Sequence, residues 1–235
     1  MPTDDLKKHY TEFYNKSSLI HVYPNEFIVR IFQGEYPNLN MKKNYNGKNI
    51  LDIGMGDGRN LKYLLDIGFN CFGIEIAEQI INKLKKEFYS IGYSPILKVG
   101  ENASIPFNNK AFDYLLSWNS CYYMGEYIEN KNYSESFDNY LSEFSRVLCK
   151  RGTLIASIPM NTHSIYQNAI SIDDRYVIIK DDPYKIRNNQ VMASFEDKNE
   201  LIKVLSKHFS NFKYANIISD CFGLYNNWHI IICEK

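Results

Sequence analysis

Short apolar runs alternate with amphipathic stretches along most of the chain. Apolar segments of strand length predict five strands, over residues 49–53, 70–74, 94–99, 112–117 and 152–158. The segments between them have apolar residues at helical spacing and predict helices over residues 60–67, 77–91 and 136–148. Strands that alternate with helices in this way form parallel sheets, so the pattern predicts an α/β fold with helices on both faces of the sheet.

The C-terminal part of the chain departs from this alternation. Residues 159–195 are rich in Asn, Asp, Tyr and Ile, show no clear period and are predicted to be irregular. A helix over residues 197–208, which starts at an aspartate, and two strands over residues 212–219 and 228–233 are then predicted to close the sheet.

The N-terminal segment is dense in aromatic residues. Because proline fits the first turn of a helix and an acidic residue is favoured there, Pro24 and Glu26 predict a helix over residues 24–32. The residues expected to face inward from this helix are Phe27, Ile28 and Ile31.

Composition and charge exclude several classes of function. The chain has 235 residues, and its 27 Lys plus Arg balance its 27 Asp plus Glu, so no net positive field is available to attract a nucleic acid. Its five cysteines are scattered without paired spacing, which predicts reduced thiols and no metal site. No secretory signal or membrane-spanning run is present, so we expect a cytoplasmic protein without a membrane partner.

The segment NILDIGMGDGRN, residues 49–60, places three glycines at alternate positions directly after a predicted strand. Glycines at such a turn let a ligand approach the main chain closely. The dinucleotide fingerprint G-x-G-x-x-G would need a glycine where Arg59 stands, although Glu75 at the end of the second strand is as suitable for a nicotinamide cofactor as for any other nucleoside. On these residues alone, an NAD-dependent oxidoreductase remains an alternative.

A second stretch resolves part of this ambiguity. LDIGMGDGRN together with VGENASIPFNNKAFDYLLS, residues 99–117, resembles the motifs of class I S-adenosylmethionine-dependent methyltransferases, specifically the small-molecule enzymes of type 11. The resemblance extends from about Asn46 to the C-terminus, including a strand after Lys150, Arg151 and Gly152. It implies S-adenosyl-L-methionine as cofactor and S-adenosyl-L-homocysteine as product.

The resemblance also implies a fold and a division of the chain. The fold is a Rossmann-like, mostly parallel seven-stranded sheet with helices on both faces, an antiparallel last strand and an N-terminal helical cap. The single domain would consist of a cap over residues 1–46, a cofactor-binding core over residues 47–158, and an acceptor-side insertion with a closing hairpin over residues 159–235.

Cofactor-binding positions carry over residue by residue. Glu101 would accept the exocyclic amine of adenine, and the backbone of Asn102 would face a ring nitrogen, although Asn102 replaces the small residue that is usual there. Asp57 also departs from the family, and either a place near the cationic cofactor or a solvent-facing turn remains open for it. The complete set of candidate cofactor-binding residues is Asp52, Gly54, Gly56, Gly58, Asn60, Glu75, Ile76, Glu101, Asn102, Ala103, Trp118, Asn119, Tyr14 and Arg30.

The acceptor is expected to be a small molecule, in a monomer or homodimer. Candidate residues for the acceptor pocket are Tyr23, Tyr122, Tyr123 and His163, and the candidate general bases, in order, are His163, His21 and His229. A base is useful when the acceptor is a hydroxyl. We expect O-methylation of a hydroxyl or phosphate-type oxygen of a sugar or polysaccharide precursor. The alternatives are N-methylation of a small amine, the oxidoreductase named above, and a cofactor-binding protein without transferase activity.

Overall fold

A central seven-stranded sheet organises the molecule. The structure, a computed structural model, describes residues 4–34, 36–41 and 43–235. The order across the sheet is β10 (Ser210–Ile217), β13 (Trp228–Glu234), β6 (Leu148–Pro159), β4 (Phe112–Ser117), β1 (Asn49–Ile53), β2 (Asn70–Glu75) and β3 (Ile96–Val99). All neighbouring pairs from β6 to β3 are parallel, whereas β13 runs antiparallel to both β6 and β10. The predicted Rossmann-like fold with an antiparallel last strand is confirmed.

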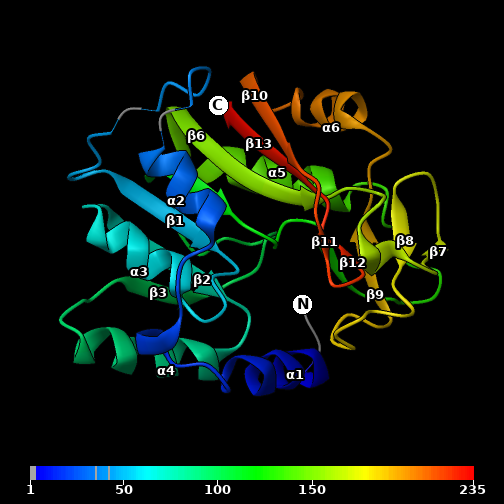
Figure 1. Cartoon of the computed structure of the whole chain (residues 1–235), viewed down its shortest axis with the longest axis horizontal. Helices are drawn as coiled ribbons and strands as arrows, with labels where there is room; N and C mark the ends of the chain where they lie inside the picture. The colour runs from blue at the N-terminus through cyan, green and yellow to red at the C-terminus, as the bar shows by residue number, and fades with distance from the viewer. Residues whose placement is uncertain (1–3, 35, 42) are drawn as a thin grey trace.

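Two hydrophobic clusters separate the faces of this sheet. Successive strand residues alternate between them, as Ile50 and Leu51 do in β1, because side chains along a strand point to opposite faces. One face is covered by α2 (Glu26–Gln33), α3 (Arg59–Asp66) and α4 (Glu78–Ser90). The other is covered by α5 (Ser136–Val147) and α6 (Lys198–Leu205), which lie on the far side of β6 and β13 (Figure 1).

The N-terminal segment contains more helix than the pattern indicated. A first helix, α1 (Asp4–Tyr14), precedes the short helix η1 (Leu19–His21) and α2. The predicted start of α2 at Pro24 was wrong by two residues, because Asn25 caps the helix by accepting the backbone N–H of Phe27 at 3.0 Å. Its buried residues include Ile28 and Ile31, as predicted.

A second, four-stranded antiparallel sheet stands beside the first. Its order is β5 (Tyr123–Glu126), β9 (Gln190–Ala193), β8 (Tyr176–Ile178) and β7 (Ile170–Ser171). Three of these strands and the short helix η2 (Ser164–Tyr166) come from the segment predicted to be irregular, and that prediction was wrong. Strands of two to four residues are too short for a period to be resolved from the sequence.

A two-stranded ribbon of β11 (Asp220–Cys221) and β12 (Leu224–Tyr225) interrupts the closing hairpin between β10 and β13. Among the helices of the described ranges, none combines the length and apolar character needed to cross a membrane.

Candidate active site

A cavity of about 320 Å³ opens at the carboxyl ends of the parallel strands. Strand β1 lies between β2 and β4. The chain continues from β1 into α3 on one face of the sheet and from β4 toward α5 on the other face, so a crevice forms between these two connections. The wall of the cavity comes from residues 53–54 after β1, 74–76 at the end of β2, 100–103 after β3, and 119–120 after β4. Its remaining wall comes from α1, β5, residues 128 and 131 after β5, the start of α5, and Gln190 of β9.

The glycine loop after β1 cannot accept side chains. Gly54, Gly56 and Gly58 have φ values of +65°, +55° and +75°, a region that favours glycine. A Cβ atom on Gly54 would lie 2.7 Å from the Cβ of Ser120, and one on Gly56 would lie 2.8 Å from the ring of Tyr14. Gly58 instead faces α4 as the N-cap of α3. The loop therefore presents bare backbone to the cavity at Gly54 and to α1 at Gly56.

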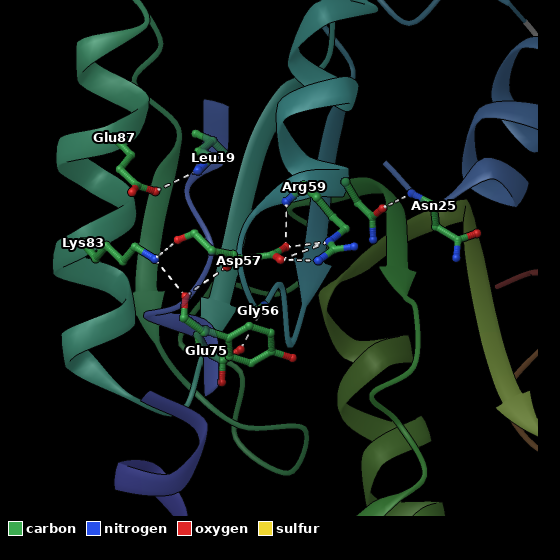
Figure 2. A network of polar contacts seen from close by, with 11 residues as sticks. Leu19, Asn25, Gly56, Asp57, Arg59, Glu75, Lys83 and Glu87 are labelled. Carbon is green, nitrogen blue, oxygen red and sulfur yellow. Dashed lines mark hydrogen bonds and ion pairs between the residues drawn. The ribbon is translucent and has the colours of Figure 1, made fainter. Parts of the chain in front are cut away.

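Glu75 is fixed by two backbone donors. Its Oε2 accepts the N–H of Gly56 at 3.1 Å (Figure 2). Its Oε1 accepts the N–H of Ile76 at 2.8 Å. A carboxylate has about four acceptor sites, so each oxygen keeps a lone pair for a ligand. Burial raises the pKa of Glu75, and the two backbone hydrogen bonds partly oppose this. Both carboxylate oxygens can thus accept a pair of adjacent hydroxyls.

Three polar candidates near the loop, Asp52, Asp57 and Asn60, do not line the cavity. Asp52 is buried, and burial, followed by the charges of Glu75 and Asp57, raises its pKa well above the ordinary value. Asp57 pairs with Arg59, whose Nε donates to the two carboxylate oxygens at 2.9 and 3.1 Å. The Oδ1 of Asn60 accepts the backbone N–H of Asn25 at 3.0 Å and joins α3 to the start of α2 (Figure 2).

The loop after β3 supplies the opposite wall. Glu101, Asn102 and Ala103 line the cavity, and Glu101 pairs with Ser104 in an isolated bridge. The side-chain amide of Asn102 donates to the backbone carbonyl of Ser120 at 3.2 Å. Asn102 therefore ties the loop after β3 to the loop after β4.

The loop after β4 places its two candidate residues differently. Asn119 lines the cavity, and its backbone N–H and side-chain oxygen both bond the hydroxyl of Ser157 at 2.7 Å. Trp118 is buried in the hydrophobic cluster beneath the loop. It supports the wall and is not among the residues that line the cavity.

Helix α1 covers the cavity on the side of the glycine loop. Tyr14, which was a candidate, and Tyr10, which was not, both line it. The hydroxyl of Tyr10 donates to the Oε1 of Gln190 at 3.4 Å, and its ring meets that of Tyr123 edge-on at 6.4 Å. Burial raises the pKa of Tyr10 and Tyr14, so both are neutral phenols at physiological pH. The spacing of four residues between them on one helix was the signal that could have found Tyr10.

Lys83 of α4 holds α1 in this position. Its ammonium donates to the backbone carbonyls of Tyr14, at 2.8 Å, and of Ser17, while Glu87 accepts the N–H of Leu19 at 3.3 Å (Figure 2). This role of Lys83 could not be predicted from the sequence, because Lys83 lies among several lysines on the polar face of a helix.

Three further candidates do not reach the cavity. Tyr23 is 83% exposed, and Arg30 is exposed and forms an ion pair with Glu26 at 3.8 Å. Tyr122 is buried in the core, whereas its neighbour Tyr123 lines the cavity. Tyr23, which precedes α2, and Arg30 of α2 lie away from the cavity because α1, and not α2, lies over the glycine loop.

No candidate histidine lines the cavity among the residues that the structure describes. His21 is exposed on η1, and the Nδ1 of His229 shares a hydrogen bond of 2.8 Å with the hydroxyl of Tyr214. The Nδ1 of His163 accepts the backbone N–H of Ile165 at 3.1 Å, which leaves its proton on Nε2. Burial lowers the pKa of His163 to about 4, so it is a weak base.

Comparisons with known proteins agree with this geometry. Residues 51–156 match the family model described as the methyltransferase domain. A search of the curated proteins gave no match. A SAM-dependent methyltransferase from Methanosarcina mazei superposes with a TM-score of 0.63 at 19% identity, over 86% of this chain and 98% of that one.

Two other solved structures share the fold. One, from Thermotoga maritima, is described as a possible histamine N-methyltransferase and has a TM-score of 0.61 at 16% identity, over 99% of this chain and 100% of that one. The other is a 1,6-didemethyltoxoflavin-N1-methyltransferase from Burkholderia thailandensis with bound S-adenosylhomocysteine, with a TM-score of 0.54 at 14% identity, over 81% of this chain and 72% of that one.

The match to the methyltransferase-domain model and the order of the sheet agree on a class I S-adenosylmethionine-dependent methyltransferase. The methyltransferase domain matched in this chain covers residues 51–156, and its cofactor is S-adenosylmethionine. The residues of the site fit S-adenosylmethionine, because the glycines leave the backbone of the loop after β1 free of side chains and Glu75 keeps a lone pair on each oxygen. When bound, the cofactor supplies a methyl group on a positively charged sulfur.

Proposed function

We propose that this methyltransferase acts on the nitrogen of a small amine, bound in the cavity between α1 and the second sheet. The observation that carries the proposal is the absence of a histidine base from the described wall of the cavity. A hydroxyl must lose its proton to become a good nucleophile, so its methylation gains from a base. A neutral amine attacks with its own lone pair and can release the proton afterwards.

The charges in the cavity wall also favour an amine. The wall has three carboxylates, Glu75, Glu101 and Glu126, against one ammonium, Lys131. Glu75 and Glu101 are the candidates for the cofactor, so Glu126 of β5 remains to attract a protonated amine. The bound ammonium loses one proton to solvent before its lone pair attacks the methyl group, and the methylated product carries the positive charge that sulfur loses. The neutral rings of Tyr10 and Tyr14 add faces that attract cations.

The remaining residues of the cavity wall need only align the acceptor with the methyl group of the cofactor. Displacement of a methyl group from sulfur proceeds in line, and removal of water from the site favours the loss of charge on sulfur. The contact of Tyr10 with Gln190 joins α1 to β9 and encloses the cavity on that side. The Thermotoga maritima protein is described as a possible histamine N-methyltransferase and the Burkholderia thailandensis protein as an N1-methyltransferase, which is consistent with a nitrogen acceptor in this fold.

O-methylation of a sugar or polysaccharide precursor gains no support from the site. Of the three histidines chosen to act as base, one is exposed and two are engaged through Nδ1, and none faces the cavity. The amine alternative is the better match to the described wall.

The experiment offers methyl-labelled S-adenosylmethionine and pairs of acceptors with the same carbon skeleton, one an amine and one an alcohol. We expect label in N-methyl products. Label in ethers or esters, with the amines unused, would contradict the proposal. A matched pair of variants locates the amine: Glu126→Gln should raise KM for the amine about tenfold, whereas Glu129→Gln, which is exposed, should leave it unchanged.

A further inference from the structure

The loop between β8 and β9 is built around a buried carboxylate. The side chain of Asp182 has no exposed area. Its Oδ2 accepts the backbone N–H groups of Ile186 at 2.9 Å and Arg187 at 3.1 Å, and its Oδ1 accepts Nη1 of Arg187 at 2.8 Å. One carboxylate thus fixes both the backbone of this loop and the guanidinium that the loop carries.

The guanidinium is aimed at the cavity wall. Nε of Arg187 donates to the phenol oxygen of Tyr123 at 2.8 Å, and the side chain of Arg187 is 17% exposed. Tyr123 itself lines the cavity, at the opposite end of β5 from Glu126. Within the described chain, no hydrogen bond uses Nη2 of Arg187.

A buried ion pair is a costly way to hold a loop. Removing two charges from water is unfavourable, and well-packed apolar residues often replace such pairs without loss of stability. We therefore expect the Asp182–Arg187 pair to have a role besides holding the loop. A phenol whose oxygen accepts from a cation keeps its own hydrogen to donate elsewhere, and the cation strengthens that donation.

We propose that Tyr123, held by Arg187, binds a carboxylate of the acceptor, so that the substrate is an amino acid or a similar amine bearing a carboxylate. This inference rests on the proposed N-methylation. Glu126 and Tyr123 then form two poles of one chamber, the first for the ammonium and the second for the carboxylate. Tyr123 contacts the acceptor, and Arg187 is a positioning residue that acts through it.

The test compares amino acids with the amines that remain when their carboxylate is removed, beginning with glycine against methylamine and alanine against ethylamine, and continuing through the larger pairs. Methyl transfer from labelled S-adenosylmethionine gives KM and kcat for each. We expect kcat/KM to be at least about tenfold higher for the carboxylated member, since hydrogen bonds to charged groups are the stronger ones.

The variants separate positioning from folding. Tyr123→Phe keeps the ring and the Asp182–Arg187 pair, and should raise KM for amino acids about tenfold to a hundredfold while leaving kcat within about threefold. Arg187→Lys keeps the charge beside Asp182 and should give a smaller increase in KM. Tyr184→Phe is the control, because it removes an exposed hydroxyl from a ring 5.6 Å from the same guanidinium. Melting curves and S-adenosylhomocysteine affinity verify that each variant is folded.

Three results would overturn the inference. They are equal use of amines with and without a carboxylate, an equal effect of Tyr123→Phe on both members of a pair, and no transfer to any carboxylated amine. The first of these leaves N-methylation intact. Transfer to alcohols alone would instead refute the proposed function itself.

Discussion

Replacing Glu75 by glutamine tests the cofactor site with the smallest change of shape. The carboxylate is held by the N–H groups of Ile76 and Gly56 and keeps one lone pair on each oxygen for the ribose of the cofactor. Hydrogen bonds to a charged group contribute about 1.5–3 kcal/mol, and neutral ones about 0.5–1.5 kcal/mol. Glutamine keeps one acceptor and loses the charge, so the expected loss is about 2–3 kcal/mol, or roughly 30–150-fold in affinity.

Isothermal titration of S-adenosylhomocysteine into the Glu75→Gln variant measures this loss. Glu78→Gln is the matched control, because Glu78 is an exposed residue in the first turn of α4, three positions further along the chain. It should bind with unchanged affinity. A change of less than threefold in the Glu75 variant, or an equal loss in the control, would refute the assignment of Glu75 to the ribose.

The remaining predictions concern the lid, the histidine and the loop. Lys83→Met should speed the dissociation of S-adenosylhomocysteine about tenfold in stopped-flow measurements, because it frees α1, whereas Lys86→Met on the exposed side of α4 should have no effect. His163 has a folded pKa of about 4 against 6.5 in the unfolded chain, so its contribution to stability is complete above pH 6.5 and about 3 kcal/mol is lost as the pH falls toward 4. Urea melts should therefore show that the His163→Phe variant loses less stability than the wild type between pH 7 and 4.5. The pH dependence of kcat should be the same in both proteins, and a changed pH dependence of kcat in the variant would restore His163 as a candidate base. Asp182→Asn should cost about 3–5 kcal/mol in the same melts, and a loss below about 1 kcal/mol would contradict its role in the loop.

The central sheet could be predicted from the sequence because its inner strands, such as β1 and β4, are largely buried and form apolar runs. The predicted bounds of β1 and β4 match the structure at both ends, and Asp197 caps α6 as its position suggested. The second sheet could not be predicted from the sequence. Its strands span two to four residues, and their pairing depends on tertiary contacts between β5 and a segment far along the chain.

The cofactor side of the site was predicted better than the acceptor side for a physical reason. The glycines and Glu75 follow parallel strands whose ends meet at one edge of the sheet, so their sequence positions fix their location. The acceptor side depends on α1, β5 and the loop that carries Arg187, whose placement follows from packing. Tyr23 and Arg30 were chosen from α2 and the residue before its predicted start, and no period in the sequence indicated that α1 covers the cavity.

Thermal unfolding of the whole chain with S-adenosylhomocysteine or NAD is the most direct test of the central claim, that the bare loop at Gly54 and Gly56 and the carboxylate of Glu75 hold the nucleoside of a methyl donor. A ligand at one hundred times its Kd adds about 2.7 kcal/mol of stability, which corresponds to about 5–10 °C for a chain of this size. We predict that rise with S-adenosylhomocysteine and no rise with NAD at the same concentration. A rise with NAD alone, or with neither ligand, would contradict the claim.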